Sequence, residues 1–138
     1  MNERITKLEN EYANLWFYPE YGIIHHQFLQ PMSDRHFKTT LMTGLELMRE
    51  YRVVKWLSDD RANSITSADA GAWSQEYWLP RAYQAGWKYW AVLPPIKARG
   101  RINMERLVGY VGQQMKIEIE VFADPDDALQ WLIKQPAS

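Results

Sequence analysis

Charged side chains gather where three of the predicted strands end, and their types are those that bind ions or move protons. Asp59, Asp60 and Arg61 follow one strand, Asp124 follows the last strand, and a basic loop follows the strand between them. Open α/β sheets bind ligands outside the carboxyl ends of their strands, so these groups are predicted to converge. A carboxylate pair facing cations could bind an anion, or run acid–base chemistry once water is excluded. The candidate ligand-binding residues are Asp59, Asp60, Arg61, Lys97, Arg99 and Arg101.

The same charges have a plainer explanation, which the sequence leaves open. Arg61 can pair locally and Asp124 can simply cap a helix, because surface ion pairs are common and contribute little. The Lys97–Arg101 segment could receive phosphate or a nucleic-acid backbone. It lacks interleaved aromatic residues, however, and the chain as a whole is not basic. We expect no nucleic-acid partner and keep a small anionic ligand as an alternative.

Motifs for metals, cofactors and nucleophilic catalysis are missing from the sequence. His25 and His26 are adjacent on a predicted strand, so they point to opposite faces and cannot share a metal ion. The chain has no cysteine, which excludes disulfides, thiolate catalysis and cysteine metal sites. Gly109 and Gly112 match no phosphate-binding loop. We expect no metal, no cofactor and no catalytic residue, and therefore a protein that is not an enzyme.

Length and composition fit one folded domain spanning residues 1–138. Hydrophobic residues make up 46% of the chain and charged residues 24%, which is ordinary for a globular protein. Sixteen basic and seventeen acidic residues leave a formal charge of −1, so no overall field draws the protein to nucleic acid or an anionic membrane. No apolar run is long enough for a signal peptide or a membrane span. We expect a cytoplasmic protein without membrane insertion.

Turn and cap residues divide the chain into alternating strands and helices. A hairpin is predicted from Leu15–Tyr18 and Ile23–Phe28, because proline and glycine lie in the turn between them. Ser33 can cap a helix that ends near Tyr51. Val53–Leu57 reads as the next strand. Thr66 or Ser67 can then cap a second helix that Gly86 ends and that Pro80 should kink or split.

The C-terminal half continues the alternation. Trp87–Leu93 reads as a strand, and apolar residues from Met104 to Val111 recur at helical spacing. Ile117–Phe122 is the last predicted strand, and Asp124 followed by Pro125 starts a final helix. The order β-β-α-β-α-β-α-β-α predicts a mostly parallel five-stranded α/β sheet with an N-terminal antiparallel hairpin and helices mainly on one face.

Alternating polar and apolar residues in several strands predict that the other sheet face is partly uncovered. The residues expected on this open face are Lys55, Lys88, Trp90, Glu118 and Glu120. Most of the seven tryptophans fit core positions. Trp16 and Trp90 are the exceptions. Together with Phe17 and Tyr18 they fall on the edge hairpin or the open face, where aromatic residues often mark a contact. We expect this surface to bind a protein partner or a second copy of the chain as a homodimer.

Four groups of residues carry a resemblance to a known family over nearly the whole chain. They are Val53–Arg61, Trp73 with Trp78–Pro80, Gly86–Ala91, and Phe122–Asp124 with Ala128, Trp131 and Leu132. Their pattern resembles the small bacterial proteins of the STAS and SEC14-like superfamily, which have the fold of the anti-sigma-factor antagonists. The resemblance implies a non-enzymatic regulatory or protein-interaction module.

One motif departs from that family. The antagonists are switched by phosphorylation of a serine in an Asp-Ser-Ser-Gly type motif, and here the corresponding stretch reads Asp59-Asp60-Arg61-Ala62-Asn63-Ser64. Ser64 is the nearest hydroxyl, but a loop residue beside a helix cap explains it better than a phosphorylation site. Two functions therefore remain open. One is the interaction module, and the other is a small-ligand or anion-binding protein with its site at the carboxyl ends of the strands.

Overall fold

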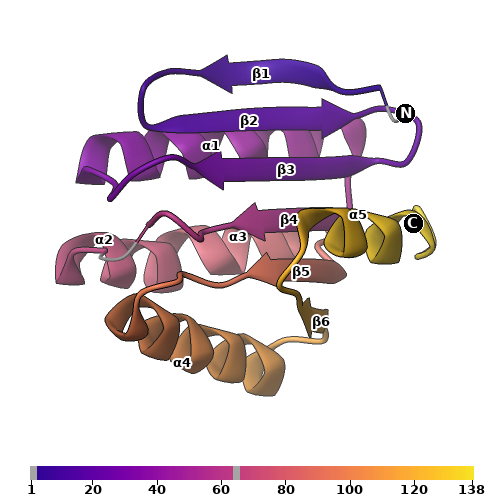
Figure 1. The fold of residues 1–138 in the computed structure, drawn as a ribbon. Coiled ribbons are helices and arrows are strands. Elements are labelled where there is room, and N and C mark those ends of the chain that lie inside the picture. The colour runs from indigo at the N-terminus through magenta and orange to yellow at the C-terminus, as the bar shows by residue number, and fades with distance from the viewer. Residues whose placement is uncertain (1–2, 64–65) are drawn as a thin grey trace.

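A six-stranded mixed sheet forms the centre of the protein in a computed structural model that describes residues 3–63 and 66–138 (Figure 1). The strands are β1 (Ile5–Glu9), β2 (Ala13–Tyr18), β3 (Ile23–Phe28), β4 (Lys55–Asp59), β5 (Tyr89–Leu93) and β6 (Glu118–Val121). They lie side by side in chain order; β1 to β3 pair antiparallel, and β3 to β6 pair parallel. The predicted α/β class, the hairpin and the parallel strands are confirmed, whereas the predicted number of five strands is wrong because β1 adds a sixth.

Helices cover the two faces of the sheet unequally. They are α1 (Asp34–Tyr51), α2 (Ala68–Trp73), the π-helical turn η1 (Ser74–Trp78), α3 (Leu79–Gln84), α4 (Ala98–Gln114) and α5 (Pro125–Ile133). Parallel strands in chain order with right-handed crossovers place every connecting helix on one face. Helix α5 follows the last strand and packs against β4 and β5 from the other side (Figure 1). None of the helices in the described ranges is long and apolar enough to cross a bilayer.

Local signals in the sequence set most helix ends. The side chains of Ser33, Ser67 and Asp124 each accept a hydrogen bond from a backbone N–H in the first turn of the following helix, as predicted. Gly86 adopts a φ of +109°, which glycine tolerates and which ends the helical segment. The predicted split at Pro80 is confirmed, because the π-helical turn ends just before it and Pro80 lies in the first turn of α3.

The predicted open face is wrong for two of its residues. Trp90 pairs in register with Trp56, so both point toward the connecting helices, and Trp90 is only 3% exposed. Lys55 pairs with Tyr89 and therefore points to the opposite side, where it too is buried. The remaining three predicted residues, Lys88, Glu118 and Glu120, are exposed.

The hairpin aromatics are also buried within the chain, because β1 pairs along the outer side of β2 and covers this edge. Phe17 stacks on Tyr51 of α1, and Trp16 lies beneath the guanidinium of Arg4. Tyr18 bonds to the imidazole of His25. The exposure that suggested an interface at Trp16, Phe17, Tyr18 and Trp90 is therefore absent, and their role in association stays a prediction without that support.

Candidate functional site

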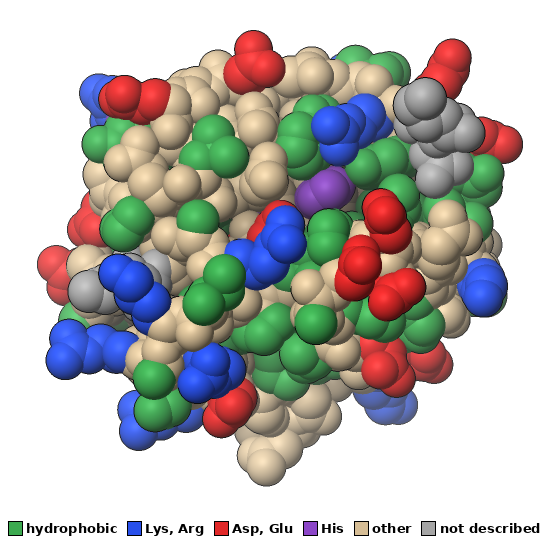
Figure 2. All heavy atoms as spheres, viewed as in Figure 1, with side chains coloured by type: hydrophobic (Ala, Val, Ile, Leu, Met, Phe, Trp, Pro, Cys, Tyr) green, Lys and Arg blue, Asp and Glu red, His purple; other side chains and the backbone are tan. Residues whose placement is uncertain are grey.

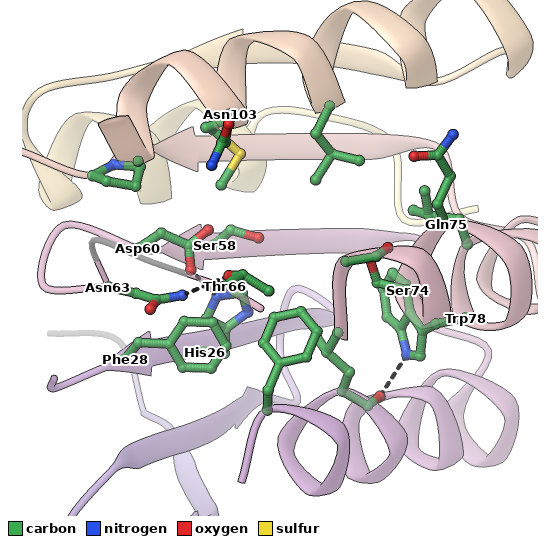
Figure 3. A pocket seen from close by; sticks show the side chains of 18 of the residues that line it. His26, Phe28, Ser58, Asp60, Asn63, Thr66, Ser74, Gln75, Trp78 and Asn103 are labelled. Carbon is green, nitrogen blue, oxygen red and sulfur yellow. Dashed lines mark hydrogen bonds and ion pairs between the residues drawn. The ribbon is translucent and has the colours of Figure 1, made fainter. Parts of the chain in front are cut away.

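A pocket of about 390 Å³ opens between the α2–η1 segment and α4, over the carboxyl ends of the central strands (Figure 3). This is the end of the sheet at which the sequence predicted a ligand site. Its walls are mostly apolar, and the side chains that matter most below are Phe28, Trp56, Trp78, Trp90, Met104 and Leu107. A pocket of this size with an apolar lining and a few polar groups is typical of small-molecule sites.

Small side chains on both helical walls leave the space between them unfilled. The helical wall of α2 and η1 presents Gly71, Ala72 and Ser74 to the pocket, and α4 presents Gly100 and Asn103. A Cβ atom added at Gly71 would meet no other atom within 4 Å. The gap therefore exists because neither helix carries a large side chain at these positions.

Four tryptophans behind the pocket form a connected chain of edge-to-face contacts. The ring centroids are 5.1 Å apart for Trp56 and Trp78, 5.6 Å for Trp78 and Trp87, and 5.3 Å for Trp87 and Trp90. Each indole N–H is bonded inside the protein, to His26 Nδ1 from Trp56 (2.9 Å), Leu41 O from Trp78 (2.7 Å), Tyr89 O from Trp87 (3.1 Å) and Ser58 Oγ from Trp90 (2.8 Å). These rings consequently offer a ligand aromatic surface and no free donor.

The polar centre of the pocket is the pair formed by His26 and Asp60 (Figure 3). Nε2 of His26 lies 2.8 Å from Oδ1 of Asp60, and both residues are buried. Because Trp56 donates to Nδ1, that nitrogen carries no proton, and the single imidazole proton resides on Nε2. The imidazole is therefore neutral and donates to a carboxylate whose negative charge it does not cancel.

Ser58 lies beside this pair on the same face of β4, and it too is buried. Its Oγ accepts the indole N–H of Trp90. Both ring nitrogens of His26 are already engaged, with Trp56 and with Asp60, so the imidazole has no lone pair left to activate the Ser58 hydroxyl.

The six ligand residues predicted from the sequence do not form one site. Asp59 points to the α5 side of the sheet, where Arg61 donates to both of its carboxylate oxygens at 2.9 and 2.8 Å. This hydrogen-bonded pair raises the pKa of Arg61. Only Asp60 lines the large pocket. The basic loop predicted after β5 is instead the start of α4, with Lys97 at the N-cap and Arg99 and Arg101 in the helix; all three are exposed and lie outside the pocket. Local pairing of Arg61 and capping by Asp124 were the plainer explanation, and the contacts agree with it.

His26, Ser58 and Asn103 were missed in the sequence, and the available signal was weak. Strand alternation indicates that His26 and Phe28 share a face, but not that a tryptophan from another strand fixes the imidazole. Ser64, named above as a phosphorylation site that is not expected, lies outside the described residues.

His25 forms a separate buried group on the opposite side of the sheet. Nδ1 of His25 lies 3.0 Å from the hydroxyl of Tyr18, and within the described ranges Nε2 has no partner. Burial is the main cause that lowers the pKa of His25 to about 3, and the nearby carboxylate of Asp59 opposes this shift. Figure 2 shows this side of the molecule, where a histidine lies among basic, acidic and hydrophobic side chains.

No group of three or more His, Asp or Glu side chains in the described part of the chain is arranged to hold a metal ion. No protein-family model, curated protein or solved structure matches the chain.

Proposed function

We propose that the protein is a non-enzymatic domain that binds a small, partly apolar molecule between α2–η1 and α4. The observation that carries this proposal is the pocket of about 390 Å³, with apolar walls and a buried polar pair at its centre. It favours the ligand-binding alternative over an interaction module that uses the hairpin aromatics, because those aromatics are covered within the chain.

The way the polar groups are engaged supports binding over catalysis by a serine nucleophile. An enzyme of the serine-nucleophile type needs a base with a free lone pair next to the hydroxyl. Trp56 occupies the lone pair of His26, and Trp90 bonds to Ser58. The hydrogen bonds from these two indoles fix the side chains of His26 and Ser58, which can then hold a bound molecule in one orientation.

The family resemblance supports a regulatory role for ligand binding, because STAS-like and SEC14-like domains act through binding. Helix α4 could respond to a bound ligand, since it forms one wall of the pocket. Only Gly100 and Val111 of α4 are buried, so a ligand in the pocket would add contacts between this helix and the α2–η1 wall. We keep the bacterial STAS-like family, the cytoplasmic location and the protein partner or homodimer as predictions.

Filling the pocket tests the proposal. The probe is a library of small aromatic and aliphatic fragments, with binding read from the indole N–H signals in heteronuclear NMR spectra. We expect hits to shift the signals of Trp56 and Trp90. Gly71→Leu should abolish these shifts, because the new side chain occupies open pocket space.

The matched control is Gly109→Leu. Gly109 is also a helical glycine with open space around its Cβ position, but it does not line the pocket. Binding should persist in this variant. Hits that survive Gly71→Leu, or that shift only the indoles outside the pocket, Trp16, Trp73 and Trp131, would contradict the proposed site.

A further inference from the structure

We propose that the pocket selects an organic cation, a protonated amine attached to an apolar body, with the carboxylate of Asp60 as its counter-ion. This inference deepens the proposed function and rests on it. The sequence suggested an anionic ligand. In the structure Arg61 pairs with Asp59 on the other side of the sheet, which leaves the carboxylate of Asp60 without this cation in the pocket and favours a cationic ligand.

The charge on Asp60 is buried and has no cationic partner within residues 3–63 and 66–138. The carboxylate side chain is 8% exposed, and among the described residues its close side-chain partner is the neutral imidazole of His26, with no Lys or Arg paired to it. Arg61, the adjacent cation, is held by Asp59 on the other side of the sheet. In the described ranges, Oδ2 of Asp60 makes no hydrogen bond, so one carboxylate oxygen is available to a ligand.

Trp56 is what keeps this charge uncancelled. A doubly protonated His26 would neutralise Asp60, but the indole N–H of Trp56 points at Nδ1 from 2.9 Å and requires a lone pair there. A buried carboxylate beside a neutral imidazole is costly unless a cation approaches it. A ligand ammonium that donates to Oδ2 supplies both the charge and the hydrogen bond.

The walls around Asp60 also favour a cation. Phe28, Trp56 and Trp90 line the same pocket, and aromatic surfaces attract ammonium groups. The indole N–H groups of Trp56 and Trp90 donate to His26 and Ser58, so they do not point at a bound cation. Met104 and Leu107 of α4 provide the apolar surface for the rest of the molecule.

One basic side chain lines the pocket, Arg106 of α4. It is exposed, and no ion pair joins it to Asp60 in the described part of the chain. It therefore lies at the rim and leaves Asp60 as the charge inside. An anionic ligand could reach Arg106, but it would then meet the carboxylate of Asp60 on entering the pocket.

A pair of probes that differ only in charge tests the inference. The probes are 2-phenylethylamine, protonated at neutral pH, and 2-phenylethanol, which has the same apolar body and no charge. We expect the amine to bind wild-type protein at least about tenfold more tightly than the alcohol, measured by titration of the Trp56 and Trp90 indole signals.

Asp60→Asn should remove this preference. Asparagine keeps the shape and an oxygen that accepts from His26, so the affinity for the alcohol should stay within about twofold while the affinity for the amine falls to the same level. The matched control is Glu105→Gln, which removes one negative charge from an exposed α4 residue outside the pocket. This variant should keep the full preference for the amine.

The outcomes separate this inference from the proposed function. Equal binding of the two probes, or a preference for the amine that survives in Asp60→Asn, would overturn the cation inference and leave ligand binding standing. If neither probe binds while other fragments still bind in the pocket, the cation inference is also overturned and ligand binding stands. If no fragment shifts these indoles either, both proposals fall. Should Asp60→Asn not fold, the comparison of the two probes on wild-type protein still decides the case.

Discussion

Replacing Gly44 by alanine tests how tightly α1 is packed on the sheet beneath the pocket. Gly44 lies against the ring of Trp56, and a Cβ atom built on it would overlap the ring atoms Cη2 and Cζ3 and lie 3.2 Å from Cζ2. The ring cannot easily move, because Trp56 is 1% exposed, bonded to His26 and in edge contact with Trp78. The position demands glycine for close approach and not for its backbone conformation.

The two effects of this substitution have opposite signs. Alanine in place of glycine inside a helix gains about 1 kcal/mol from backbone entropy. Overpacking a rigid core costs about 1–3 kcal/mol, and an overlap with an immobile ring falls at the upper end. The expected net change is a loss of about 2 kcal/mol in the free energy of unfolding.

Equilibrium urea denaturation measures the change, and Gly109→Ala is the matched control. Gly109 is a helical glycine with open space around it, so its replacement should gain up to about 1 kcal/mol. The two variants should then differ by about 3 kcal/mol. The penalty at Gly44 should also disappear in a Trp56→Phe background, because phenylalanine lacks the outer ring atoms that would collide. A Gly44→Ala protein as stable as Gly109→Ala, or a penalty unchanged in that background, would refute the reasoning.

Three further predictions concern groups on both sides of the sheet. Gly71→Ala should raise the free energy of unfolding by about 0.5–1 kcal/mol in urea denaturation, because α2 gains a better helix former without a clash; a loss would contradict the open space there. The pKa of His25 lies at about 3 in the folded protein and near 6.5 unfolded, so the unfolded chain binds more protons between these values. Wild-type stability should therefore fall as pH drops from about 6.5 toward 3, with a slope of at most about 1.4 kcal/mol per pH unit, and His25→Gln should show a shallower fall. Arg61→Met should lower thermal stability by leaving the buried Asp59 unpaired, at a cost of about 1–3 kcal/mol, and Asp59→Asn in the same protein should restore part of it.

The sequence predicted the order of elements because local signals determine it. Ser33, Ser67 and Asp124 cap helices through their own backbone neighbours, and Gly86 ends a helix through its own φ angle. The first strand, Ile5–Glu9, was missed because it is five residues long, carries Lys and Glu, and is at most half buried at the sheet edge.

The sequence predicted a ligand site at the end of the sheet where the pocket opens, but of the six residues it named only Asp60 lines this pocket. The strand expected at Val53–Leu57 runs instead over Lys55–Asp59, because Asp59 pairs with Gln27 and Leu93. With Asp59 inside the strand, it points away from the face that Asp60 lines, and the two carboxylates cannot act together. The pocket itself depends on side-chain sizes on two helices far apart in sequence, which no local pattern reveals.

The chain of four tryptophans behind the pocket has an optical consequence. Their rings follow one another at 5.1 to 5.6 Å, close enough for their electronic transitions to couple and for excitation to pass from ring to ring. The coupling among Trp56, Trp78, Trp87 and Trp90 should therefore give a near-ultraviolet circular dichroism signal that vanishes on unfolding. A molecule that quenches the ring nearest to it would dim the emission of all four. Tryptophan emission should therefore report binding at the proposed site.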